Sequence, residues 1–111
     1  MGIGIEDPNS KLVVDGKINS EEVNVEIING PDYVFEPDYD LRTLEETKAY
    51  IAQYKHLPEI PSAKEMEANG VDLGEMNMLL LKKIEELTLH QIQLLERLEQ
   101  AEKELSDLKN E

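Results

Sequence analysis

The acidic and aromatic residues between Tyr33 and Asp40 are the first candidates for chemistry in this sequence. Glu36, Asp38 and Asp40 lie close together beside Tyr33 and Tyr39, and paired carboxylates commonly serve general acid/base catalysis. The cluster has no matched base, nucleophile or glycine-rich loop beside it. It also lacks the ligand spacing and final Glu of an EF-hand calcium loop. We therefore expect a solvated or helix-capping loop, with no catalytic residue, cofactor or metal.

The two histidines are the other candidates for a metal or acid/base site. His56 lies in a stretch bounded by two prolines, and His90 lies far along the chain in a helical pattern. Neither has a histidine or cysteine three or four residues further on. We expect His56 to be hydrogen-bonded inside a packed loop and His90 to flank a helical seam. A pH-sensitive contact at His56 stays open if a sister chain covers that loop.

The composition of the chain limits its fold and its partners. With 111 residues, one Phe, four Tyr and no Trp, the chain has few residues for a core, so self-association would supply the missing burial. A net charge of −14 repels nucleic acids and anionic membrane surfaces. Cysteine is absent, which excludes disulfides and thiolate metal sites. The start carries no secretory signal pattern, and we expect the chain to be a piece of a longer protein.

The first zone, residues 1–35, has short β-like signals. Apolar residues from Leu12 to Val14 precede Asp15-Gly16, and Val23, Val25 and Ile27 then alternate with polar residues. Asp-Gly between apolar runs predicts a hairpin. Turn residues surround Pro8 and Asn29. Strands so short and few need a neighbouring element or sister chains to cover them.

The second zone, residues 36–71, has the signals of short helices. Thr43 with Glu46 and Ser62 with Glu65 match the capping-box pattern, and Asn69-Gly70 predicts a helix end. The two prolines of the intervening stretch, 55–61, exclude a helix there and predict an extended connector.

The third zone, residues 72–111, predicts one long helix. Asp72 with Glu75 repeats the capping pattern, and no Pro or Gly follows Gly74. The apolar residues fit a heptad in which positions a and d form the seam of a coiled coil. The predicted oligomer interface consists of Leu73, Asn77, Leu80, Ile84, Leu87, Gln91, Leu94, Leu98, Ala101, Leu105 and Leu108.

The neighbouring e positions indicate how many helices associate. Leu81, Thr88 and Leu95 widen the apolar face in the first half of the helix, which favours more than two strands and a parallel trimer. The polar residues Asn77 and Gln91 at a positions either specify register or are tolerated. The sequence thus predicts an α+β chain: a short β segment, a connector region with short helices, and a coiled-coil helix.

Two sets of motifs resemble a known family. The stretch Gly2-Ile-Gly-Ile-Glu-Asp-Pro-Asn-Ser-Lys-Leu-Val-Val-Asp-Gly-Lys-Ile18 resembles the "GIGT..P..KL.V.G.I" segment of tail-fibre-like and large surface proteins. The remaining motifs resemble the C-terminal module of tail-fibre-domain proteins common in Bacteroidota. They are Tyr33-Val-Phe35, Asp38-Tyr39, His56-Leu-Pro58, Ile60-Pro-Ser62, Leu73-Gly-Glu-Met-Asn77 and 80–89.

The resemblance implies a trimeric end of a fibre shaft, at a cell surface, outside the cell or in a virion or phage-like tail. It implies a structural, non-enzymatic assembly module whose partner is a second and third copy of itself. A receptor- or glycan-binding tip, with a ligand on a host surface, is the alternative. The aromatics Tyr33, Phe35, Tyr39, Tyr50 and Tyr54 would then form a platform, although we expect a small core from them.

The layout is also similar to that of self-cleaving intramolecular chaperones. However, Asn19-Ser20-Glu21-Glu22 is acidic where their cleavage motif is basic. Self-cleavage is therefore the least favoured function.

Overall fold

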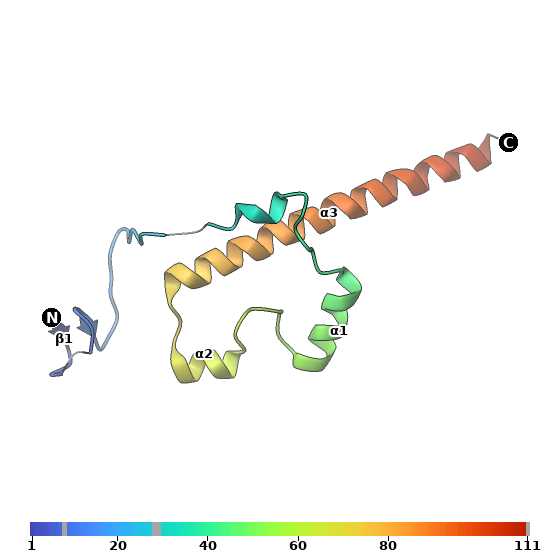
Figure 1. Cartoon of the computed structure of the whole chain (residues 1–111). Coiled ribbons are helices and arrows are strands. Elements are labelled where there is room, and N and C mark those ends of the chain that lie inside the picture. The colour runs from blue at the N-terminus through green and yellow to red at the C-terminus, as the bar shows by residue number, and fades with distance from the viewer. Residues whose placement is uncertain (8, 28–29, 111) are drawn as a thin grey trace.

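The computed structural model describes residues 1–7, 9–27 and 30–110 and has an elongated, mostly helical shape. It measures 79 × 31 × 28 Å, with a Cα radius of gyration of 21.3 Å, whereas a compact domain of this length has a radius of about 13 Å. Figure 1 shows the reason: the C-terminal part of one long helix projects beyond every other element. A chain of this shape cannot cover all of its apolar surface by itself.

Three helices begin where the capping patterns predict: α1 (Leu44–Tyr54), α2 (Ala63–Asn69) and α3 (Leu73–Lys109). The hydroxyl of Thr43 accepts a hydrogen bond from the Glu46 N–H at 3.0 Å. Ser62 does the same for the Glu65 N–H at 3.2 Å. The glutamate carboxylates accept from these hydroxyls instead of reaching back to the backbone, so each predicted box forms in part.

Helix ends follow the prediction in one place and depart from it in another. After α2, Gly70 takes a φ of 74°, a conformation that favours glycine, and its N–H donates to the Met66 carbonyl. At the start of α3, Asp72 is extended but makes no side-chain capping bond, so the predicted acidic cap is wrong. The four free N–H groups of that end are therefore not capped by Asp72.

The β-rich zone predicted for residues 1–35 is largely absent. Strands β1 (Gly2–Ile3) and β2 (Val13–Val14) form one parallel pair of two residues each. No hairpin forms at Asp15-Gly16, and residues 23–27 belong to no strand, because the chain offers them no partner strand. The turn residues Pro8 and Asn29 lie outside the described residues. The α+β prediction is therefore confirmed for the helices, but the sheet consists of two strands of two residues each.

The alternating segment 23–27 packs on a helix instead of in a sheet. Val25 and Ile27 line a hollow at the start of α3 together with Gly74, Met78 and Leu79. A Cβ atom on Gly74 would lie 2.9 Å from the Val25 Cγ1 atom and 3.4 Å from the Ile27 Cδ1 atom. The lack of a side chain at Gly74 is what permits this close approach.

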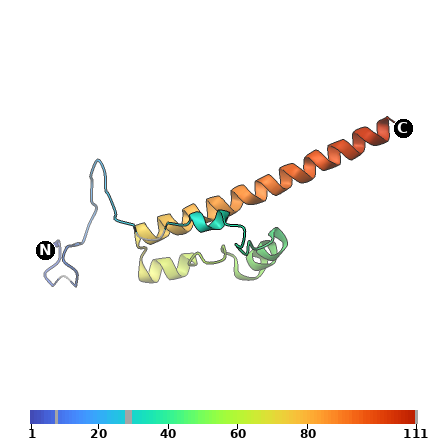
Figure 2. The same cartoon turned by 45° about the horizontal axis from the view of Figure 1, so that its top comes forward.

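The 3₁₀ helix η1 (Asp32–Phe35) lies along the first half of α3. Helices α1 and α2 lie on another side of α3 (Figures 1 and 2). Val34 of η1 is 1% exposed and is the one fully buried side chain among the described residues. The connector 55–61 is non-helical, as predicted, and joins α1 to α2. The core is thus minimal: besides Val34, the buried residues of the described chain are Pro31, Pro58 and the polar Glu85, Glu86 and His90.

We predict that Gly74→Ala releases the segment 23–27 from α3. The added methyl group must displace Val25, and overpacking typically costs about 1–3 kcal/mol, while alanine itself is favourable in a helix. Cleavage after Glu22 and Glu26 by a glutamate-specific protease should accelerate, with helix content unchanged. Val25→Ala in the same chain removes the clashing Cγ1 atom and should restore slow cleavage; equal cleavage of the wild type and Gly74→Ala would contradict the contact.

Candidate functional site

The outward face of α3 is covered by its own chain over the first half of the helix. Most of its b, c, f and g positions are half-buried or buried. Met78 and Leu79 lie beside the segment 23–27, and the others lie beneath η1, the start of α1 and the connector 55–61, which we call the docked layer. These positions are Met78, Leu79, Lys82, Lys83, Glu85, Glu86, Leu89 and His90. The buried and half-buried residues of α3 therefore lie on one side of the helix.

A chain of charged groups holds the docked layer to α3. The Tyr39 hydroxyl donates to Glu86 Oε2 at 2.7 Å, and Glu86 pairs with Lys83 at 3.0 Å. Lys83 and Lys82 both reach Glu59 of the connector, at 3.1 and 2.6 Å. Lys82 and Lys83 of α3 thus both pair with Glu59, and Lys83 also pairs with Glu86, which fixes the position of the connector along α3.

The environment of this network shifts the pKa of its members. Partial burial and the hydrogen bond to Glu86 raise the pKa of Tyr39 to about 12. Burial by itself would lower the pKa of Lys82, but the hydrogen bond to Glu59 outweighs it and raises that pKa. Burial likewise opposes ionisation of Glu59, yet the bonds from Lys82 and Lys83 prevail, so its pKa lies below 4.5. At neutral pH Lys82 and Glu59 are therefore both charged, while the Tyr39 hydroxyl keeps its proton.

Glu85 is in the opposite situation. It is 7% exposed, and its Oε2 atom has no hydrogen-bond partner within the described part of the chain. Burial raises the pKa of Glu85, and the Asp32 carboxylate at the start of η1 raises it further. A buried carboxylate facing a second one disfavours docking of η1 whenever both are ionised.

The predicted seam lies on the other side of α3 and is open. All eleven predicted a and d residues are exposed in the single chain. The exposed fraction of their leucine and isoleucine side chains runs from 44% at Leu80 to 67% at Leu73. The e residues Leu81, Thr88 and Leu95 are exposed as well. One continuous apolar stripe therefore faces solvent along the whole helix.

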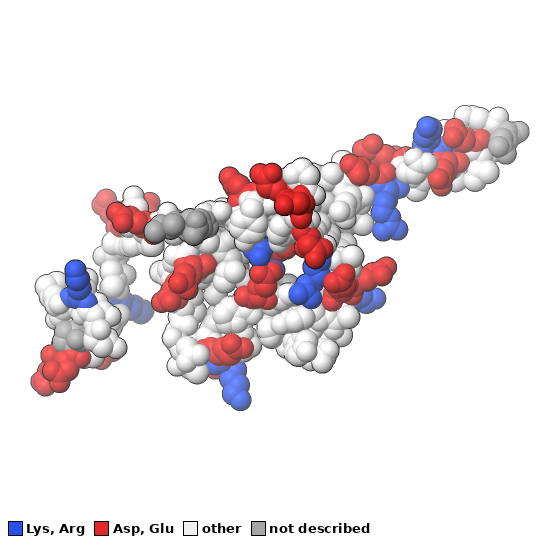
Figure 3. Space-filling model, viewed as in Figure 1, with Lys and Arg blue, Asp and Glu red and all other residues white. Residues whose placement is uncertain are grey.

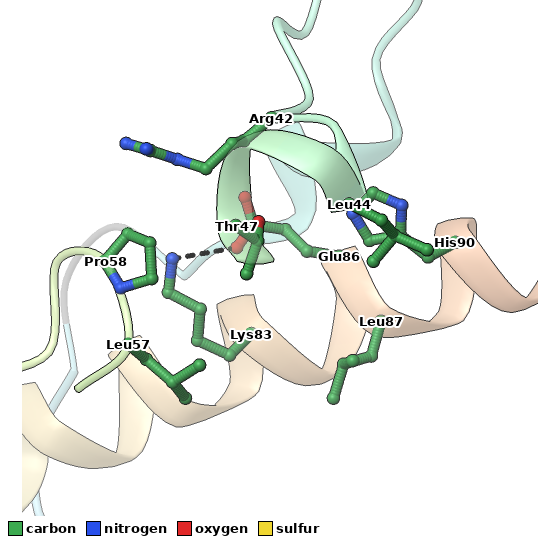
Figure 4. A pocket seen from close by; sticks show the side chains of 9 residues that line it. All are labelled: Arg42, Leu44, Thr47, Leu57, Pro58, Lys83, Glu86, Leu87 and His90. Carbon is green, nitrogen blue, oxygen red and sulfur yellow. Dashed lines mark ion pairs between the residues drawn. The ribbon is translucent and has the colours of Figure 1, made fainter. Parts of the chain in front are cut away.

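A hollow opens beside this stripe, between the docked layer and α3. Its cavity volume is about 90 Å³, and its apolar lining comes from Leu44, Leu57, Pro58 and Leu87. Figure 4 shows the Leu57 side chain on the same side of α3 as Leu87, with Lys83 directed toward Glu86 and Leu44 beside His90. The docked layer thus continues the apolar surface sideways from the seam.

The residues first considered for chemistry do not come together. Glu36, Asp38 and Asp40 are all exposed, and Tyr39 between them turns to Glu86 instead. Over residues 1–7, 9–27 and 30–110, no group of three or more His, Asp or Glu side chains is placed to hold a metal ion. The His56 Nδ1–H donates to the Leu57 carbonyl at 2.9 Å, and His90 is 8% exposed beneath the start of α1.

Four of the five aromatics form two pairs, and the five do not make a common core. Tyr33 stacks near Tyr39, with ring centroids 5.9 Å apart, while Tyr50 contacts Tyr54 at 4.5 Å. Tyr33, Phe35 and Tyr54 are about half exposed. The expected aromatic core is therefore wrong for the single chain, because Val34 occupies the one fully enclosed position.

Sequence reasoning missed the polar network. Glu59, Lys82 and Lys83 carry it, and none of them was singled out. The only signal was a pair of adjacent lysines on a strongly acidic chain, beside apolar residues.

Comparison with known proteins gives no relative: the chain matches no protein-family model, and no curated protein or solved structure is significantly similar to it. Within the residues that the structure describes, none of the helices has the length and apolar character needed to cross a membrane.

We predict that Glu85→Gln stabilises the folded chain near neutral pH and much less in acid. The folded state raises the pKa of Glu85 above 4.5, so folding retains a proton that the unfolded chain releases, and stability falls as pH rises through that window. The amide mimics the protonated form and should raise the melting temperature at pH 7. At pH 4 the variant and the wild type should melt together.

Two other neutralisations serve as controls for that experiment. Glu99→Gln occupies the same heptad position on the uncovered half of α3 and should change the melting temperature little at either pH. Glu59→Gln should lower stability at pH 7 by about 1 kcal/mol or less, since the pair is partly exposed. Its effect should decrease as the pH falls below 4.5 and disappear below the lowered pKa of Glu59 in the folded chain. Identical responses at positions 59 and 85 would refute the assignments.

Proposed function

We propose that this chain is a structural assembly module that self-associates through α3. The observation that carries the proposal is the division of α3 into two faces. Over the first half of α3 the docked layer and the segment 23–27 cover most of the b, c, f and g positions, whereas the predicted a and d residues and the e residues Leu81, Thr88 and Leu95 are exposed. A monomer would leave an apolar stripe as long as the helix in water, and such large exposed patches mark interaction sites.

A parallel trimer suits this face best. The exposed e residues Leu81 and Leu95 broaden the stripe beyond the two positions that a dimer needs. The remaining surface also favours a specific partner over general stickiness. Figure 3 shows acidic side chains spread over the docked layer and the far end of α3, with fewer basic ones among them. The net charge of −14 therefore opposes indiscriminate association of copies, whereas the apolar seam offers them one favourable contact.

The parent of such a module would be a fibrous surface or tail-fibre-like protein, as the motif resemblance implies. The segment 17–27 supports this proposal. It is extended and exposed, and no backbone–backbone hydrogen bond joins it to another described residue. Extended chains with unpaired backbone groups are what a β-rich shaft would pair between protomers. The parent would then act at a cell surface, outside the cell or in a phage-like tail.

Recognition of a glycan or host receptor is the second candidate. The half-exposed rings of Tyr33, Phe35 and Tyr54 favour it, since aromatic faces in solvent stack well on apolar ligand surfaces. A glycan array distinguishes the two functions: binding that is lost in Tyr33→Ala, with the oligomer intact, would support recognition in addition to assembly.

We predict that Leu87→Asp dissociates the oligomer and that Leu108→Asp does not. Leu87 is 57% exposed in the single chain but would be enclosed at a d position, where unpaired buried carboxylates cost several kcal/mol each. Leu108 is in the last turns, 65% exposed, and the same change should cost about 1 kcal/mol or less. Light scattering gives the masses. A wild-type monomer, or a Leu87→Asp oligomer, would refute assembly through α3.

A further inference from the structure

The docked layer is placed to take part in the assembly itself. In a parallel coiled coil, each g position lies beside the e position that follows it on the neighbouring helix. On α3 the g edge is the one next to the docked layer, because Lys83 and His90 line the hollow with Leu44 and Leu57. A second hollow, lined by Leu44, His90, Leu94 and Arg97, continues it toward the C terminus. The e residues of a second copy would therefore meet both hollows.

We infer that the e edge of a neighbouring copy of this chain packs against the docked layer, with its Leu95 seated against Leu44 beside His90. Both partners are exposed in the single chain, Leu95 at 53% and Leu44 at 43%. Thr88 of the neighbour then lies over Leu87 and the first hollow. The inference rests on the proposed self-association and adds that the hollow of each copy is completed by a residue of the next.

The charges along the two edges fit a parallel, in-register arrangement. Toward the C terminus the g residues are Arg97 and Glu104, and the e residues that follow them are Glu102 and Lys109. Each g residue thus faces an opposite charge on the neighbour. Nearer the start, Met76 faces Leu81, His90 faces Leu95, and Lys83 faces the uncharged Thr88. An antiparallel pairing sets g against g and e against e, so both ion pairs are lost.

Three aspartate substitutions test the contact with the docked layer. Leu95→Asp and Leu44→Asp should each weaken self-association about tenfold or more in sedimentation equilibrium, because each would bury a carboxylate. Asp in the first turn of α1 is favourable, so the fold of the single chain should survive Leu44→Asp. Ile92→Asp is the control: Ile92 is 45% exposed on the outward b edge of α3 and should assemble like the wild type.

The outcomes separate this inference from the proposed function. A monomeric wild type overturns both. A wild-type oligomer that Leu95→Asp weakens, while Leu44→Asp behaves like Ile92→Asp, keeps assembly through α3 and overturns the role of the docked layer. Equal losses in all three variants overturn it too, since the outward b edge would then matter as much as the e edge.

Orientation is tested by single cysteines, which the natural chain lacks. Leu105→Cys should form disulfide-linked dimers of chains under mild oxidation, since parallel copies bring this a position to itself; Ile92→Cys should not. Arg97→Glu should weaken association roughly threefold or more, and Glu102→Arg added to it should restore the wild-type affinity. No crosslink at position 105, or no rescue by the double change, would overturn the parallel register.

Discussion

The rest of the structure depends on one constraint: α3 carries more apolar circumference than the remaining chain can cover. In proteins a helix gains most of its stability by packing one face against other elements, and α3 has 37 residues to cover. The chain meets this need on the outward face, where η1 contributes the fully buried Val34. No other part of the described chain covers the a and d residues of the opposite stripe, from Leu73 to Leu108. The chain therefore has too few residues to cover α3. This explains the elongated shape, the exposed seam and the minimal core.

Polar contacts join the docked layer to the outward face of α3. Their main effect is to fix where the connector 55–61 lies along the helix. Ion pairs that are partly open to water add little stability, but Lys82 and Lys83 meet Glu59 only when the connector has one register along α3. Glu59 adopts a φ of 69° there, a backbone conformation that side chains rarely take. The network thus places Leu57 beside Leu87, at the edge of the seam, at a small cost in backbone strain.

Local chemistry in the sequence predicted the helices well and the β zone poorly. Thr43, Ser62 and Gly70 act on their own helix ends, so their types suffice to predict those ends. The heptad predicted an oligomer interface, which stays a prediction, and its a and d residues are exposed in the single chain. Alternation in 23–27 predicts extended backbone with one buried side, but says nothing of the partner, which is Gly74 on α3. Asp15-Gly16 fails because a hairpin needs a second strand, and the contacts of Glu59 and Glu85 join residues too distant for any local pattern.

A parallel bundle would cover both the extended segment 17–27 and the exposed seam of α3. Gly74 is where the segment contacts the helix. Because Val25 approaches Gly74 so closely, the segment leaves the molecule at the start of α3, next to Leu73 and within one turn of Asn77 of the seam. In a parallel bundle the starts of all copies of α3 lie at one end, so their extended segments meet there as well. An antiparallel bundle would send them to opposite ends, where each would stay unpaired. The unpaired backbone of residues 17–27 thus adds its own argument, independent of the heptad charges, for the parallel arrangement.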